Sequence, residues 1–178
     1  MKTFSIDETQ TSYLPSQRSS PLVVEKQTQM ISEAPLLDEI FSKIPLMFQI
    51  LNSNRQVVYM NSLLKKELEL KKIEYGYGYR PGEILQCQHA FETNGGCGTS
   101  QSCQHCNVVN CVVDALNNSS FSTREASFVS MINDKSEMIN YKVSSKPFIW
   151  QNEQFMILTF ENISEIKRKE QLERTFFH

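Results

Sequence analysis

The sequence predicts an α+β fold, in which an antiparallel sheet of five strands has its helices on one side. Two observations lead to this prediction. Two short apolar runs, 46–51 and 56–60, flank the turn Asn52-Ser53-Asn54-Arg55 and are typical of a β-hairpin. Three further strand-like segments lie between residues 121 and 160, and the chain between the two groups of strands has helical patterns.

The first 34 residues are expected to form a flexible or loosely helical leader. Half of the first twenty residues are Ser, Thr or Gln, a composition that buries too little apolar surface to offset the entropy of ordering. The stretch Val23–Ala34 has helix-forming residues but little apolar stripe. Order is expected to begin near Pro35, where apolar residues recur at helical spacing, namely Leu36, Leu37, Ile40, Phe41 and Ile44.

Local sequence signals predict the helices and strands between residues 45 and 160. Pro45 ends the first helix, and Asn61-Ser62 can cap a short helix after the hairpin. A longer helix is expected over Cys103–Leu116. The strands that follow are expected at Phe121–Ile132, Ile139–Val143 and Phe155–Phe160; the second alternates apolar and polar residues, as a half-buried strand does.

The last segment, 163–178, is charged and helix-forming. Its rough apolar stripe, formed by Ile163, Ile166, Leu172 and Phe176, allows two interpretations. The helix either packs back on its own domain or continues as a coiled-coil linker in a dimer. With barely two heptads, the periodicity alone does not decide between them.

Composition excludes several classes of protein. The chain has 178 residues, a net charge of −2 and 18 Lys+Arg against 20 Asp+Glu, so no basic surface for nucleic acid is expected. No apolar run approaches the roughly 18 residues of a membrane span, and the first ten residues lack the apolar core of a signal peptide. We expect a cytoplasmic protein with no membrane span in this piece.

Five cysteines within 25 residues are the most informative feature of the sequence. Four of them, Cys87, Cys97, Cys103 and Cys106, have the spacing C-x9-C-x5-C-x2-C. Four thiolates complete the ligand set of a structural zinc ion or of an iron–sulfur cluster, and both remain open. Reversible thiol or disulfide chemistry and simple packing are the alternatives.

Three residues near these four cysteines give weaker indications of a function. Cys111 lies on a different face of the expected helix and is predicted to pack in the core. His89 and His105 flank the cysteines, either as ligands, as hydrogen-bond donors to sulfur or as exposed loop residues. A haem bound by His105 is a weak alternative. An enzyme with Cys103 or Cys106 as nucleophile and His105 as base ranks last, because neighbours on a helix point apart.

Two segments resemble PAS sensor domains. The hairpin ILNSNRQVVYMN and the ending FMILTFENISEIKRKEQLE are similar to that family over roughly residues 36–165, although Glu161-Asn162-Ile163-Ser164 has Glu where the family more often has Asp. The stretch PGEILQCQHAFETNGGCGTSQSCQHCNVV resembles a cysteine-bearing subset of PAS domains in bacterial sensor kinases. Members of the wider family that hold iron–sulfur clusters report oxygen or redox state, which favours that function here.

The ending KRKEQLERTFFH resembles the start of the phosphotransfer helix of histidine kinases. This resemblance makes His178 the phosphoacceptor, although the acidic residue and the Asn that normally follow are absent. Implied partners are a second copy through the exit helix, a kinase catalytic domain and a response regulator. The piece has no glycine-rich ATP-binding sequence and is not expected to be an enzyme by itself.

Together these observations divide the chain into a leader (1–34), a PAS sensor domain (35–162) and a signalling helix (163–178). The expected function is two-component signal transduction, with redox or oxygen sensed through a cysteine-ligated iron–sulfur cluster or metal. The alternative is a structural zinc-binding or thiol-switch dimerisation module without cofactor-based sensing.

Overall fold

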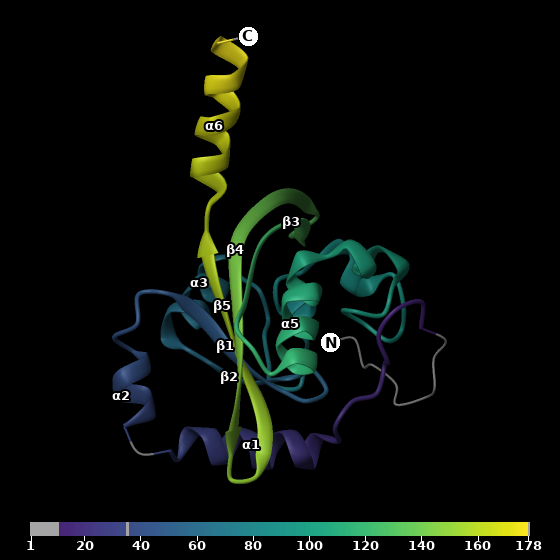
Figure 1. The fold of residues 1–178 in the computed structure, drawn as a ribbon, viewed down its shortest axis with the longest axis vertical. Helices are drawn as coiled ribbons and strands as arrows, with labels where there is room; N and C mark the ends of the chain where they lie inside the picture. Colours follow the sequence, from purple (N-terminus) through teal and green to yellow (C-terminus); the bar gives the residue numbers. More distant parts are fainter. Residues whose placement is uncertain (1–10, 35, 178) are drawn as a thin grey trace.

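The computed structural model describes residues 11–34 and 36–177, and its centre is one antiparallel sheet (Figure 1). The strands stand in the order β2-β1-β5-β4-β3. Their bounds are β1 Met47–Asn52, β2 Val57–Met60, β3 Ser122–Ile132, β4 Lys135–Trp150 and β5 Glu153–Asn162. The predicted α+β class and its five-stranded antiparallel sheet are therefore confirmed.

Tight turns explain why the last three strands form a continuous meander. The β3–β4 turn places Asn133 and Asp134 at positive φ, and the β4–β5 turn does the same with Gln151 and Asn152. Two successive residues at positive φ are typical of the two-residue hairpin turn that matches the twist of the strands. Strand β4 is consequently much longer than the alternating segment 139–143 from which it was predicted.

One face of the sheet is covered by the helices between the two groups of strands. These are α3 Ser62–Leu70, α4 Pro81–Ile84, the 3-10 turns η1 Gln88–Phe91 and η2 Gln101–His105, and α5 Asn107–Asn118. Asn61 caps α3 as predicted, since its side chain accepts a hydrogen bond from the Leu64 backbone N–H at 3.2 Å. The main core lies under these helices, where α3, α4 and α5 bury apolar side chains against the sheet.

The opposite face is covered too, which differs from the prediction of helices on one side. Helix α1, Pro21–Ser32, is regular and begins with Ser20 as its N-cap. Val24 and Ile31 of α1 pack against the sheet, and α2, Leu37–Phe41, packs nearby. The second core contains Phe48, Ile50, Val58, Tyr59 and Phe155. The leader thus contains an integral helix, because β1, β2 and β5 have apolar residues on both faces.

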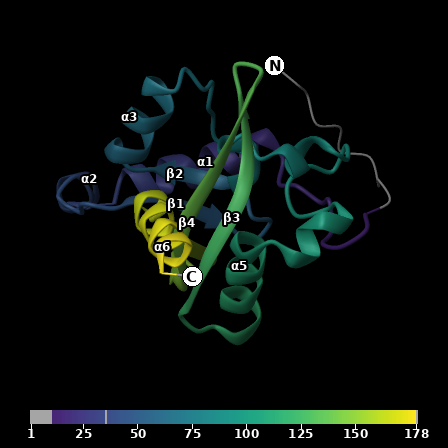
Figure 2. The ribbon, with the colours of Figure 1, turned by 90° about the horizontal axis from the view of Figure 1, so that it is seen from above.

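Helix α6, Ser164–Phe176, projects away from the sheet (Figures 1 and 2). Of its described residues none is buried, and Phe176 is 81% exposed. The interpretation that this helix packs back on its own domain is therefore wrong. Only its first turn is attached, where Ser164 Oγ accepts from the Asn140 N–H and Lys167 pairs with Glu125 of β3. His178 lies outside the described residues.

Across the described residues, we find no helix with the length and apolar character that crossing a membrane requires.

Candidate functional site

The four predicted cysteines line one cavity of about 220 Å³. The cavity lies between η1, η2 and the start of α5 on one side and β3 on the other, and its surface is mainly apolar. The other lining residues are Gly82, Leu85, His89, Ala90, Ser102, His105, Val108, Val109, Ser127 and Phe128, with the thiols of Cys87, Cys97, Cys103 and Cys106.

Each cysteine has a specific local environment. Cys87 forms an isolated antiparallel bridge with Ser130 of β3, and its N–H donates to the Gly82 carbonyl at 2.8 Å. The buried Cys97 accepts the Gly82 N–H at its Sγ, 3.3 Å away. Cys103 Sγ lies 3.3 Å from Ser100 Oγ, and Cys106 precedes the first turn of α5.

The four cysteines that line the cavity do not form a ready metal site. All five cysteines are free, and the described part of the chain contains no group of three or more His, Cys, Asp and Glu side chains placed to hold a metal ion. A tetrahedral zinc ion with bonds of about 2.3 Å would bring four sulfurs to within roughly 4 Å of one another. The described residues contain no set of side chains placed in this way.

The remaining candidates, Cys111 and the two histidines, lie in different surroundings. Cys111 is fully buried on α5, where its Sγ lies 3.3 Å from the Ser122 carbonyl oxygen, so its predicted packing role is confirmed. His89 and His105 both line the cavity, and His89 Nδ1 is paired with Glu92.

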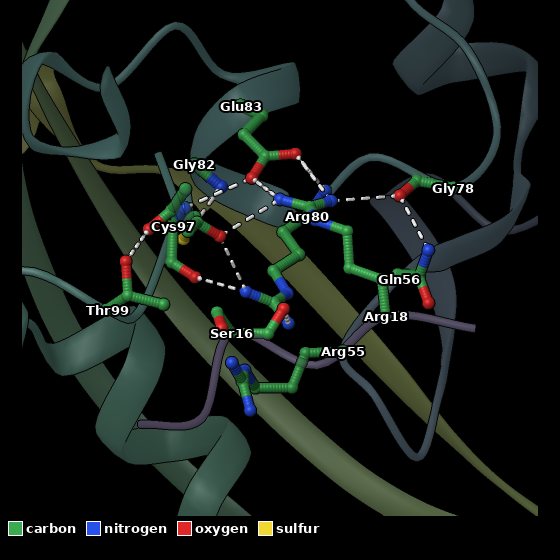
Figure 3. Close-up of polar contacts among 12 residues, drawn as sticks. Ser16, Arg18, Arg55, Gln56, Gly78, Arg80, Gly82, Glu83, Cys97 and Thr99 are labelled. Carbon is green, nitrogen blue, oxygen red and sulfur yellow. Dashed lines mark hydrogen bonds and ion pairs between the residues drawn. The ribbon is translucent and has the colours of Figure 1, made fainter. Parts of the chain in front are cut away.

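Arg80, which donates a hydrogen bond to the Cys97 carbonyl oxygen, is completely buried (Figure 3). The Arg80 guanidinium has no carboxylate partner among its hydrogen bonds; it donates to five backbone carbonyl oxygens at 2.8–3.3 Å, those of Asn54, Gly95, Cys97, Ser16 and Gln17. These carbonyls belong to three segments distant in sequence. Arg80 therefore joins the β1–β2 turn, the cysteine segment and the N-terminal segment at one point.

Glu83 is the buried acid of this cluster. Its carboxylate accepts the backbone N–H groups of Arg80 at 2.8 Å and Cys97 at 3.1 Å, and it pairs with the Arg18 guanidinium. Gly96, at φ +82°, passes directly over this ion pair. The carboxylate thus fixes the main chain on which Cys97 is mounted.

Arg55 completes what we call the guanidinium cluster, Arg18, Arg55 and Arg80. Arg55 Nη2 donates to the Pro15 carbonyl at 2.7 Å, while its buried Nε has no hydrogen-bond partner. Burial, followed by the positive charges of Arg55 and Arg18, lowers the pKa of Arg80 to about 9. Burial also lowers the pKa of Arg55, and the nearby Cys97 opposes that shift.

An N-terminal strap, residues 12–19, runs beside the cysteine segment (Figure 2) and offers the carbonyls of Ser16 and Gln17 to Arg80. Its N–H groups at Ser12 and Leu14 donate to the carbonyls of Thr99 at 2.9 Å and Gly98 at 3.1 Å. Tyr13 and Leu14 pack on the small apolar cluster that includes Cys97, Cys103 and Val109. The strap is therefore ordered against the cysteine segment, which the expectation of a flexible or loosely helical leader missed, although none of its residues lines the cavity.

Three of the four thiols, those of Cys87, Cys97 and Cys106, are not activated for nucleophilic chemistry. Burial raises the pKa of the Cys87 thiol to about 11, and burial followed by the Glu83 charge raises that of Cys97 well above its ordinary value. A nucleophilic cysteine needs the opposite shift. Burial also raises the pKa of Cys106, one of the two nucleophiles of the enzyme interpretation, which weighs against that choice. Binding a metal to these three thiols must displace protons.

We expect iodoacetamide to modify Cys87 slowly in reduced, metal-free protein at pH 8. Only the thiolate reacts, so the rate should rise about tenfold per pH unit until pH approaches the pKa of about 11. An ordinary thiol levels off near a pH of about 8.5. Mass spectrometry of the Cys87 peptide across pH 7–10.5 measures this rate, and a plateau below pH 9.5 would contradict the raised pKa.

Comparison with known proteins gives likenesses in structure only. No protein-family model matches the chain, and no curated protein matches it in sequence. Among solved structures, the PAS domain of nitrogen regulation protein NR(II) from Vibrio parahaemolyticus is 14% identical, with 73% of this chain and 100% of that chain covered and a TM-score of 0.45. The PAS domain of an HTR-like protein from Haloarcula marismortui is 15% identical, covers 74% and 98%, and has a TM-score of 0.42. A LOV protein from Rhodobacter sphaeroides is 13% identical, covers 78% and 68%, and has a TM-score of 0.47.

Proposed function

We propose that this chain is the PAS-type sensory domain of a histidine kinase and senses redox state or oxygen through an iron–sulfur cluster on Cys87, Cys97, Cys103 and Cys106. One observation carries the proposal. The four cysteines line a single cavity, whereas Cys111 is buried elsewhere with polar partners of its own.

The size and the lining of the cavity favour a small inorganic centre. A volume of about 220 Å³ is below the roughly 300–1,000 Å³ of pockets that enclose an organic ligand, which argues against haem or flavin. Thiols spread around a cavity suit a polynuclear cluster, in which each cysteine binds its own iron, better than a single zinc ion. When bound, such a cluster supplies a centre that changes its charge or its integrity with redox state or oxygen.

Residues of this chain connect the cavity to the exit helix. Asn107, next to Cys106, donates from Nδ2 to the Glu125 carbonyl at 2.6 Å, and the Glu125 carboxylate pairs with Lys167 of α6. A shift at Cys106 would therefore reach the root of α6 through β3. The exposed apolar residues of α6, Ile166, Leu172 and Phe176, would pair with those of a second copy.

In this proposal the chain is a regulatory part and not an enzyme. His178 would accept the phosphoryl group from the kinase catalytic domain and pass it to a response regulator. The protein would act in the cytoplasm.

The test is purification without oxygen, followed by an absorption spectrum and by iron, zinc and sulfide analysis of one sample. We expect a brown protein with stoichiometric iron and acid-labile sulfide. Serine in place of any of the four cavity cysteines should remove the iron, and the matched control Cys111→Ser should retain it. A colourless protein with one zinc per chain would contradict the sensor proposal and indicate a structural zinc-binding module. Absence of both metals would leave a thiol switch.

A further inference from the structure

Cys103 and Cys106 are joined by one turn of 3-10 helix. The turn η2 ends at His105, and the Cys106 N–H donates to the Cys103 carbonyl oxygen at 3.1 Å. In a 3-10 helix the side chains of residues i and i+3 stand on the same side, and a rise of about 2.0 Å per residue separates their Cα atoms by roughly 6 Å. A disulfide joins residues whose Cα atoms are about 4.4–6.8 Å apart. The backbone therefore already places this pair within reach of a disulfide bond.

The two side chains meet in the same surroundings, and neither sulfur has a strong partner. Both residues line the mainly apolar cavity. Burial raises the pKa of the Cys106 thiol and a charge on Cys103 acts in the same direction, so the two sulfurs are close enough to interact. Cys103 Sγ has only a weak hydrogen bond with Ser100 Oγ, at 3.3 Å. Cys106 is the N-cap residue of α5, and its side chain makes no capping hydrogen bond there.

The other two cysteines of the cavity are held by contacts outside this turn. Cys87 forms its backbone bridge with Ser130 of β3, and Cys97 Sγ accepts the Gly82 N–H at 3.3 Å. A disulfide that required either residue to shift would break one of these contacts. A disulfide between Cys103 and Cys106 requires a change within one turn only, so this pairing is favoured over the others.

Closing that disulfide would change the turn that contacts the strap. The Cβ atoms of a disulfide are about 3.8 Å apart, closer than residues i and i+3 of a 3-10 turn, so Gln104 and His105 must take up the difference. Gln104 Nε2 donates to the Ser12 carbonyl of the strap at 3.0 Å, and the Gln104 carbonyl accepts from Asn110 Nδ2 at 3.1 Å. Asn110 Oδ1 in turn accepts from the Tyr13 hydroxyl at 3.1 Å. The turn thus connects the two thiols to the strap.

We propose that Cys103 and Cys106 form a reversible disulfide in the metal-free chain, and that this bond weakens the docking of the strap. The oxidant is a low-molecular-weight disulfide such as oxidised glutathione. The thiolate of Cys106, the more exposed of the two residues, attacks one sulfur of the reagent and releases a small thiolate; the Cys103 thiolate then attacks the Cys106 sulfur and releases the second. The two cysteines lose two electrons and two protons, and the reagent becomes two small thiols.

This inference goes beyond the proposed function, because it needs no bound centre. The first measurement locates disulfides in the 178-residue chain after a chelator and a reductant have removed any metal. The chain is brought to equilibrium without oxygen in glutathione buffers of increasing oxidised fraction, since thiols that are not activated exchange slowly. The remaining thiols are alkylated in denaturant, and tandem mass spectrometry identifies the unalkylated pair.

We expect the Cys103–Cys106 disulfide to form first and to open again when reduced glutathione is restored. Cys106→Ser should abolish it. The matched control Cys111→Ser should retain it, because Cys111 is buried at another place in the core.

The second measurement compares hydrogen–deuterium exchange of residues 12–19 in the reduced and the disulfide form, with amides of β5 as the reference for an intact fold. We expect the strap to exchange about fivefold faster in the disulfide form, the effect of losing one typical hydrogen bond. Gln104→Met removes the side-chain donor to Ser12, so the disulfide should still form while the ratio of exchange rates falls toward one. The matched control Gln101→Met replaces an exposed glutamine at the start of the same turn and should keep the ratio.

The outcomes distinguish this inference from the proposed function. Absence of the Cys103–Cys106 disulfide in every buffer, or earlier formation of another pair, would overturn the inference. Equal strap exchange in the two forms, or an unchanged ratio in Gln104→Met, would do the same. A chain that forms this disulfide but cannot be loaded with iron or zinc would overturn the proposed function alone. A chain that binds iron but never forms the disulfide would overturn the inference alone.

Discussion

Replacement of Arg80 by methionine is expected to lower the free energy of unfolding by about 3 kcal/mol. Methionine keeps an unbranched apolar stem but has no donor, so five carbonyl oxygens in three segments, two of them in fully buried hydrogen bonds, lose their partner. Relief of repulsion with Arg18 and Arg55 offsets part of the loss. The cost remains larger than that of most single substitutions because an unpaired buried acceptor loses its hydration without replacement.

Urea denaturation followed by circular dichroism measures this effect. Arg124→Met is the matched control, since Arg124 is exposed and makes a surface ion pair with Asp114 at 2.8 Å. Such pairs contribute up to about 1 kcal/mol. Similar losses in both variants would show that the buried hydrogen bonds of Arg80 add little.

Replacement of Gly96 by alanine is expected to cost about 3 kcal/mol and to loosen the Cys97 segment. The Cβ would stand in the left-handed region of backbone conformation, at φ +82°, and would collide with the Glu83 carboxylate and the Arg18 guanidinium. Those two groups form the buried ion pair, so neither can move away without losing its partner.

Thermal and urea unfolding of Gly96→Ala, together with exchange at the Cys97 amide, measure the effect. Gly76→Ala is the matched control. Its Cβ would meet only the edge of the Tyr79 ring, at 3.2 Å, and no positive φ is involved, so we expect a loss below about 1 kcal/mol. If Gly96→Ala unfolded at the same urea concentration as the unmodified chain, the close packing over Glu83 would be refuted.

Local signals predicted most of the sheet but not what covers its second face. The Asn/Ser turn and the apolar runs located the hairpin, and Asn61 marked the start of α3, because these features are decided within a few residues. Helix α1 was underestimated since Gln27 interrupts its stripe. Gln27 is nevertheless buried, with hydrogen bonds to Asn52 at 2.9 Å and Glu153 at 2.7 Å. Such partners, 25 and 126 residues away, have no local signature.

The candidate site, like the fold, was predicted only in part from the sequence. Cysteine spacing within one short segment grouped the four cysteines that line one cavity, and the helical pattern set Cys111 apart; their role as ligands stays a prediction. The guanidinium cluster was missed because its members lie at positions 18, 55 and 80 and meet only in the folded chain. Arg18 also lies in a segment whose composition resembles a flexible leader. Its order comes from backbone hydrogen bonds to the cysteine segment, which side-chain patterns do not reveal.

The helix on the second face has a practical consequence for studies of shorter fragments. A fragment that began at Pro35, the boundary suggested by the sequence, would uncover Phe48, Tyr59 and Phe155, which are at most 6% exposed in the complete fold. An apolar patch of this kind promotes self-association. Such a fragment could dimerise through the uncovered sheet face. If that dimer were attributed to α6, the inferred arrangement of the two chains, and hence of signal transmission, would be wrong.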